Sequence, residues 1–337
     1  MSYTHFLLDF FHYTTDHAMM NETIRLKPLY KERVWGGRKL ESIFNRQLPK
    51  DSGLIGESWD VVDRDEDQSL VIDGEMQGLT LNELWVNHKE LIFGTNLPQT
   101  QRFPLLVKVL DATEKLSLQV HPPESIVSGL EAEPKTEMWY IAEAEPEAEI
   151  YCGLSHEITP DVFMKNVNGG FSDDMLHKIR VSKGDFIFIP SGRLHAIGGG
   201  IVIFEIQQNS DTTYRVHDWG RTDSDGCARD LHINEALRSI NFQDVGPSKG
   251  TMVNNFLVQC PYFEVELLNL SSMESINGSM DENFAIISII DGALSCGRYD
   301  FMSGDSFIVP AQSDAEPLTL ISESSAKFLR TTIPKNN

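Results

Sequence analysis

The sequence is short of cysteine, of basic residues and of long apolar runs. No stretch approaches the roughly 18 apolar residues that a membrane-spanning helix needs, and residues 1–19 show neither a basic leader nor a small-residue cleavage site. The four cysteines (Cys152, Cys227, Cys260 and Cys296) are far apart and form no C-x-x-C pair. This spacing argues against a disulfide framework and against a thiolate metal site. Together these absences predict a globular protein of the cytoplasm.

Basic residues are outnumbered by acidic residues, 28 to 50, and the formal net charge is −22 at pH 7. Such an excess of negative charge disfavours contact with a nucleic-acid backbone or an anionic membrane. We therefore expect neither as a partner, and we expect a monomer or a homodimer. A small anionic substrate would need a local pocket of basic side chains.

Most of the chain alternates short apolar segments with Gly, Pro, Asp and Asn, which predicts a β-sandwich or β-barrel with helical insertions. Three segments favour helices instead. Thr80 followed by Glu83 forms a capping-box pattern at the start of one helix, which Gly94 would end. Thr159 followed by Pro160 starts a second helix. The amphipathic stretch "DLHINEALRSI" predicts the third.

Two segments resemble each other. "KGDFIFIPSGRLH" (183–195) and "SGDSFIVPAQSDA" (303–315) share Gly-Asp, an apolar stretch and a proline at the same spacing. The match predicts two copies of one β-unit. The second copy lacks both the glycine after its proline and the histidine, so we expect it to be structural.

This organisation divides the chain into three parts. Residues 20–245 are predicted to form one domain with helical insertions, and residues 246–337 a C-terminal domain built on the degenerate copy of the β-unit. Residues 1–19 are predicted to be an extension that is either structured or dispensable, the second because Met20 offers another start for translation.

Polar residues follow one face of the strand predicted in "KLSLQVHP". Side chains alternate along a strand, so Lys115, Ser117, Gln119 and His121 share a face while leucine and valine occupy the other. Half-buried polar groups cost free energy unless they find partners. A metal ion would satisfy two of them at once.

Two further residues could complete a metal site. Glu137 is the only acid inside the apolar part of its strand, and His195 follows a turn formed by Pro190 and Gly192. With Gln119 and His121 they supply two imidazoles, a carboxylate and an amide oxygen, a set that suits Zn²⁺ with room for water or substrate. Two histidines and a carboxylate could also hold Fe(II), so the ligands alone leave redox chemistry open.

The order of these motifs resembles one family. The pattern G184-x5-P190-x-G192-x2-H195 matches the second cupin motif, and "LVKVLDATEKLSLQVHP", "KTEMWY", "GDFIFIPSGRLHAIG" and "NSDTTYRVHDWGR" follow in the order of the type I mannose-6-phosphate isomerases, in their short bacterial form. The resemblance extends from about residue 23 to residue 221. It implies a mainly β fold of two cupin-type β-barrel or jelly-roll units with a few helical insertions, the second unit degenerate. The sequence lacks the large helical insertion of the longer enzymes and has "KTE" where they have "KPE".

The resemblance also implies functional residues. One zinc ion per chain would be held by Gln119, His121, Glu137 and His195. Substrate-binding positions are Ser117 and Lys108, and catalytic positions are Lys135, Glu205 and Arg215. Arg193, beside His195 in the turn, is a candidate for the phosphate on proximity alone.

The implied reaction interconverts mannose 6-phosphate and fructose 6-phosphate by moving a proton between C2 and C1 through an enediol. Lys135 is the first candidate for the general base, because burial and the positive charges of zinc and Arg215 should lower its pKa. Glu205 is the second candidate. Arg215 would stabilise the enediolate and could also bind the phosphate.

Two other functions are compatible with the ligands. A non-haem iron cupin oxygenase would use nearly the same set, although a histidine is usual at the position of Gln119. A sugar-binding regulatory cupin without turnover has no need of Lys135 and Arg215 in addition to the ligands.

Overall fold

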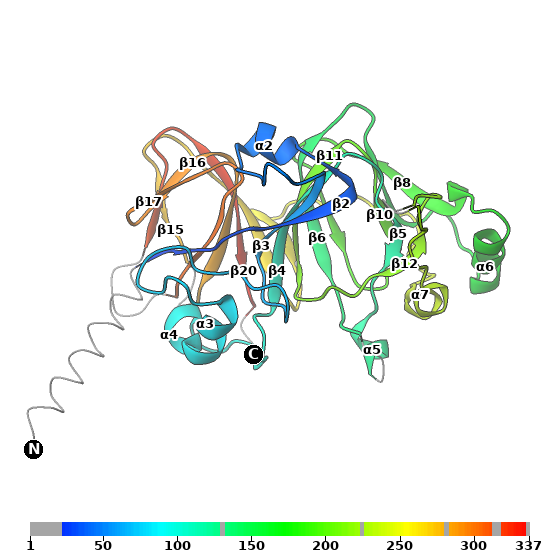
Figure 1. Ribbon diagram of the computed structural model, residues 1–337, viewed down its shortest axis with the longest axis horizontal. Coiled ribbons are helices and arrows are strands. Elements are labelled where there is room, and N and C mark those ends of the chain that lie inside the picture. The colour runs from blue at the N-terminus through cyan, green and yellow to red at the C-terminus, as the bar shows by residue number, and fades with distance from the viewer. Residues whose placement is uncertain (1–21, 129–131, 223–225, 280–282, 312–317, 335–337) are drawn as a thin grey trace, which may run out of the picture. The chain divides into compact units, whose positions relative to one another are not determined.

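The computed structural model describes residues 22–128, 132–222, 226–279, 283–311 and 318–334 (Figure 1). The predicted extension over residues 1–19 lies outside these ranges. Contacts among the described residues divide the protein into two compact units, one within residues 30–59 and 105–251 and the other within residues 22–29, 60–104 and 252–334. The sequence-based division at residue 246 placed residues 60–104 in the first domain. In the structure these residues group with the C-terminal part.

The unit of residues 30–59 and 105–251 contains two antiparallel sheets. The first has six strands in the order β2 (Leu29–Gly37), β3 (Ile55–Val61), β4 (Leu105–Ala112), β11 (Ile201–Gln208), β6 (Glu137–Ala144) and β9 (Phe186–Ile189). The second has five strands in the order β12 (Tyr214–His217), β5 (Leu118–Val120), β10 (His195–Ile197), β7 (Glu149–Leu154) and β8 (Leu176–Arg180).

Apolar side chains from both sheets form one core. Trp139 and Ile187 from the six-stranded sheet pack in the same cluster as Ile150 and Ile197 from the five-stranded sheet. The two sheets therefore face each other as in a jelly roll. Because side chains alternate along β6, Glu137 lies on the same face as Trp139 and enters this interior.

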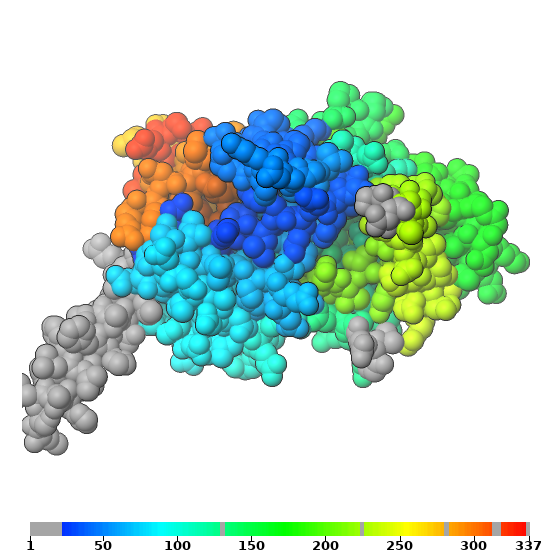
Figure 2. Space-filling model, in the orientation of Figure 1, coloured from blue at the N-terminus to red at the C-terminus, as the bar shows by residue number. Residues whose placement is uncertain are grey.

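A second core covers the other face of the five-stranded sheet. Phe163 of α6 (Pro160–Asn168) and Ala236 of α7 (Ile233–Ser239) pack there with Leu118. Figure 2 shows these segments at the surface, in green and yellow-green. Short helices α2 (Lys39–Phe44) and α5 (Glu124–Val127) and the 3₁₀ turn η1 (Asp173–Met175) complete the unit.

The other unit is built on a nine-stranded sheet. Its main path is β1 (Ile24–Arg25), β18 (Ser306–Val309), β16 (Ala285–Cys296), β20 (Ala326–Thr332), β14 (Glu264–Leu270) and β13 (Phe256–Gln259). Three strands attach beside this path, β15 (Ser275–Asn277), β17 (Tyr299–Met302) and β19 (Thr319–Ile321). Helices α3 (Leu81–Asn87) and α4 (Lys89–Phe93) belong to this unit.

The two units repeat one arrangement of strands. The order β4-β11-β6-β9 in one corresponds to β14-β20-β16-β18 in the other. Glu137 pairs with Ile189 in the first, and Ala285 pairs with Val309 in the second, each partner being the residue before a proline. Ala285 thus stands where Glu137 stands. The prediction of two cupin-type units, the second degenerate, is confirmed.

The predicted helices form, with one difference. Thr80 and Glu83 make the reciprocal capping box, since the Glu83 N–H donates to Thr80 Oγ1 at 3.1 Å and the Thr80 N–H to Glu83 Oε2 at 2.8 Å. The helix expected to continue to Gly94 is instead divided into α3 and α4 at His88, whose backbone leaves the helical region. No helix in the described ranges is long and apolar enough to cross a membrane.

Candidate metal centre and active-site pocket

Three predicted ligands converge inside the jelly roll. His121 follows β5, Glu137 begins β6 and His195 begins β10, and their ligand atoms all lie within 4.8 Å of one another. His121 Nε2 is 3.4 Å from Glu137 Oε2, and His195 Nε2 is 3.5 Å from Glu137 Oε1. All three side chains are at most 1% exposed. Residues far apart in sequence therefore form one closed cluster.

The second nitrogen of each imidazole is already bonded. Nδ1 of His121 lies 2.9 Å from the Thr212 carbonyl oxygen, and Nδ1 of His195 lies 2.8 Å from that of Arg193. A carbonyl only accepts, so both Nδ1 atoms carry the proton and both Nε2 atoms present a lone pair. Such a backbone partner is the usual orientation device of metal-binding histidines.

The two lone pairs have no partner among the described residues, because both Nε2 atoms are buried without a hydrogen bond. Burial, followed by the positive charge of Lys135, lowers the pKa of His121 to about 3, so the imidazole stays neutral. Burial alone would raise the pKa of Glu137, but the positive charge of Lys135 lowers it well below its ordinary value. Two neutral imidazoles around one carboxylate fit a divalent cation such as Zn²⁺.

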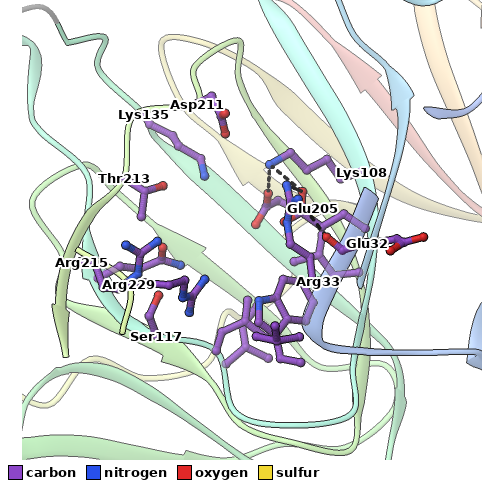
Figure 3. Close-up of a pocket in the computed structure, with 17 residues that line it drawn as sticks. Glu32, Arg33, Lys108, Ser117, Lys135, Glu205, Asp211, Thr213, Arg215 and Arg229 are labelled. Atoms are coloured by element: carbon purple, nitrogen blue, oxygen red, sulfur yellow. Dashed lines mark hydrogen bonds and ion pairs between the residues drawn. The ribbon is translucent and has the colours of Figure 1, made fainter. Parts of the chain in front are cut away.

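Gln119 adjoins this cluster. It lies opposite His195 in the pairing of β5 with β10, and its side chain lines a pocket of about 480 Å³. The pocket reaches the cluster also through Lys135, whose Nζ is 3.0 Å from Glu137 Oε2. Figure 3 shows the charged residues that surround the pocket. Its lining residues are Glu32, Arg33, Val34, Trp35, Glu57, Lys108, Leu110, Leu116, Ser117, Gln119, Lys135, Ile197, Glu205, Asp211, Thr213, Arg215 and Arg229.

The structure therefore brings most of the predicted substrate-binding and catalytic residues to one pocket. Ser117, Lys108, Lys135, Glu205 and Arg215 all line it. Arg193 does not. Its guanidinium donates to both carboxylate oxygens of Asp244, at 2.7 and 2.8 Å, and to the Phe188 carbonyl oxygen at 2.7 Å. Arg193 was a candidate for binding the phosphate because it lies beside His195 in the sequence. These bonds hold its guanidinium against Asp244 and Phe188 instead.

Lys135 is buried as predicted, yet its pKa moves in the other direction. Burial lowers the pKa, but the carboxylates of Glu137 and Glu205 outweigh burial and raise it above the ordinary lysine value. The predicted lowering included the positive charge of a bound zinc ion and stays a prediction for the metal-bound site. The spacing of the sequence did not reveal that two carboxylates approach this ammonium group.

The pKa of Glu205 moves in the opposite direction to that of Glu137. Burial, followed by the negative charge of Glu137, raises its pKa. Both carboxylate oxygens are held in place, since Oε1 lies 3.4 Å from Lys108 Nζ and Oε2 accepts a hydrogen bond of 3.0 Å from Trp139 Nε1. The arrangement gives a fixed carboxylate with increased affinity for a proton.

Sequence reasoning missed Arg33 and Glu57. Arg33 Nε donates to Glu57 Oε1 at 2.9 Å, and Glu57 Oε2 lies 3.9 Å from Lys108 Nζ. Burial would raise the pKa of Glu57, but the charges of Lys108 and Arg33 lower it to about 2. A polar residue inside an apolar strand was the signal that identified Glu137, and "IGESWDVV" carries the same signal at Glu57.

Arg229 was also missed. It comes from the segment after β12 and lies beside Arg215 and Ser117 at one side of the pocket (Figure 3). Nothing in its local sequence distinguishes it from the neighbouring Arg221, since its place depends on how the chain folds back.

Comparison with known proteins identifies close relatives. The family model for the catalytic domain of type I phosphomannose isomerase matches residues 23–152. The chain is 37% identical over 306 residues to the mannose-6-phosphate isomerase ManA of Bacillus subtilis, covering 87% of this chain and 94% of that protein. The crystal structure of the Bacillus subtilis mannose 6-phosphate isomerase superposes with a TM-score of 0.81 at 34% identity, covering 92% of this chain and 99% of that chain.

A more distant structure shares the fold. A mannose 6-phosphate isomerase bound with zinc and yttrium superposes with a TM-score of 0.68 at 15% identity, covering 92% of this chain and 98% of that chain.

Proposed function

The chain belongs to the family of type I mannose-6-phosphate isomerases, and from this we propose that it interconverts mannose 6-phosphate and fructose 6-phosphate with one zinc ion per chain. The observation that carries the proposal is the convergence of His121, Glu137 and His195 beside a pocket rich in basic side chains. As the composition predicts, we place this activity in the cytoplasm.

The metal would be held by Gln119, His121, Glu137 and His195. The two unpartnered Nε2 atoms and the carboxylate between them support this assignment, and Gln119 adds an amide oxygen from the strand opposite His195. When bound, a divalent cation supplies polarisation of the sugar's carbonyl and hydroxyl oxygens without a change of oxidation state.

Proton transfer between C2 and C1 of an enediol needs a group that accepts and returns one proton. Glu205 has the better properties for this role, because its pKa is raised and its carboxylate is fixed by Lys108 and Trp139. The Lys135 ammonium group lies 3.0 Å from Glu137 Oε2 and is better suited to donating a hydrogen bond to an oxygen that gains negative charge. The proposal thus reverses the order of the two candidates from the sequence.

The substrate would extend across the pocket from Lys135 toward Arg215. Ser117 and Lys108 line this path and supply a hydroxyl and an ammonium group to sugar oxygens. Arg215 offers a planar guanidinium suited to the phosphate. Arg193 has no part in the proposal, because Asp244 occupies it.

The relatives favour the isomerase over the two alternatives, an iron oxygenase and a sugar-binding regulator. The decisive test is turnover of mannose 6-phosphate to fructose 6-phosphate by the purified protein before chelation, after chelation and after addition of zinc. We expect activity that chelation removes and zinc restores. Absence of turnover in protein that carries one zinc per chain would contradict the proposal.

A further inference from the structure

The two ends of the pocket differ in charge balance. On one side Lys108 and Arg33 are each paired with a carboxylate, through contacts to Glu205 and Glu57. On the other side the guanidinium groups of Arg215 and Arg229 lie next to Ser117 (Figure 3). Positive charge is therefore concentrated at the arginine end.

Asp218 holds Arg229 in place. The carboxylate is 6% exposed and accepts two bonds from Arg229, from Nε at 2.8 Å and from Nη2 at 2.6 Å. It also accepts one bond of 2.6 Å from Arg221 Nη2. One negative charge thus faces two guanidinium groups and leaves a net positive charge. In the described residues the Arg229 Nη1 group makes no hydrogen bond and stays available to the pocket.

The local fold explains why these groups meet beside Ser117. An antiparallel bridge between Thr222 and Ala228 sets Arg221 opposite Arg229. Arg221 donates through Nη1 to the carbonyl oxygen of Lys115, and the indole N–H of Trp219 donates to that of Leu116 at 2.6 Å. Both acceptors come immediately before Ser117. The chain around Asp218 is therefore anchored to the segment that leads into β5.

Arg215 is fixed in a comparable way but has unused donors. Its backbone N–H donates to His232 Nδ1 at 3.2 Å, and its Nη1 group donates to the Asp230 carbonyl oxygen at 2.7 Å. Its Nε atom is buried without a partner among the described residues. Two neighbouring guanidinium groups with free donors are stabilised by a shared oxyanion, and a phosphate monoester presents three oxygens for this geometry.

We propose that Arg229, positioned by Asp218, forms a two-arginine phosphate site with Arg215 and makes the pocket specific for a phosphorylated sugar. This inference rests on the proposed isomerase for the identity of the sugar. The site itself would bind inorganic phosphate whether or not the protein turns over its substrate, so the two ideas can be tested separately.

The test uses the zinc-loaded full chain and two measurements, the dissociation constant for inorganic phosphate by calorimetry and the kinetics with mannose 6-phosphate and with mannose. In Arg229→Met we expect phosphate binding weakened about tenfold to hundredfold, as for loss of a charge-assisted hydrogen-bond pair. KM for mannose 6-phosphate should rise by a similar factor, with kcat/KM for mannose changed less than twofold. Arg180→Met, an exposed arginine outside the pocket, is the matched control and should behave as the unmodified protein.

Two further variants separate position from charge. Arg229→Lys keeps the charge without the planar fork and should recover part of the phosphate affinity. Asp218→Asn leaves Arg229 in the chain but weakens its anchor, so KM for mannose 6-phosphate should rise while zinc content stays unchanged. Phosphate affinity within twofold of the unmodified protein in both Arg229 variants would overturn the inference. The unmodified protein could also lack isomerase activity and still bind phosphate. If Arg229→Met then loses phosphate binding, the result supports the phosphate site and contradicts the proposed function.

Discussion

Lys108 and Glu205 are direct partners in the pairing of β4 with β11, and their side chains meet inside the pocket, with Nζ 3.4 Å from Oε1. The ammonium group lowers the pKa of Glu205, which burial and Glu137 raise. Since a general base must be deprotonated to act, the acid limit of the proposed activity depends in part on this contact.

Lys108→Met should move that limit. Removal of the positive charge raises the pKa of Glu205 further, so the acid limb of the kcat profile should shift to higher pH. Rates of the variant and the unmodified protein measured across the acid range test this. An unshifted limb would show that Glu205 is not the base or does not respond to Lys108.

Glu205→Gln separates the two candidates for the base. The amide keeps the shape of the side chain but cannot accept the proton, so kcat should fall by about 10² to 10⁴ with zinc content unchanged. Lys135→Met is the comparison. Near-normal turnover in Glu205→Gln together with a large loss in Lys135→Met would restore Lys135 as the base.

His195→Ala should lose metal and activity together. His195 contributes one of two unpartnered imidazole nitrogens, and its loss leaves an incomplete ligand set. Because loss even of an outer partner of a metal ligand costs about 10- to 100-fold in affinity, we expect at least that loss in zinc affinity. His177→Ala, in β8 and outside the cluster, is the control. A His195→Ala protein that is fully metallated and active would place the metal elsewhere.

Glu57 should contribute to stability in a defined range of pH. Its folded pKa is about 2, below the ordinary value of 4.5, so the stabilisation is complete above pH 4.5 and is lost as the pH falls toward 2. A shift of this size corresponds to about 3 kcal/mol. Glu57→Gln should therefore lower the free energy of unfolding at pH 7, and the difference from the unmodified protein should narrow below pH 4.5. Denaturant titrations at pH 7 and pH 3 test this, and an equal difference at both would contradict it.

Alternation along strands made much of the site predictable. Of the residues assigned to one face of the strand in "KLSLQVHP", Ser117 and Gln119 line the pocket and His121 joins the buried cluster. Alternation does not predict side-chain directions before the strand begins. Lys115 was placed on the face of Ser117, but β5 begins only at Leu118. The Lys115 ammonium instead donates to the hydroxyl of Tyr151 at 2.6 Å.

What the sequence could not predict depends on contacts between distant segments. The pKa of Lys135 rises because two carboxylates from other strands approach it. Arg229 lines the pocket and Arg221 does not, although both donate to Asp218 and look equivalent in the sequence. Arg193 lies beside His195 in the chain, yet Asp244 pairs with it. Such pairings require the folded positions of both partners.

The most direct test of the central claim is a titration of the metal-free protein with zinc while isomerisation of mannose 6-phosphate is followed. The account predicts that activity rises in proportion to bound zinc and reaches its plateau at one ion per chain, and that His195→Ala shows no such rise. Full activity before zinc is added, in protein shown by elemental analysis to contain no divalent metal, would contradict the account.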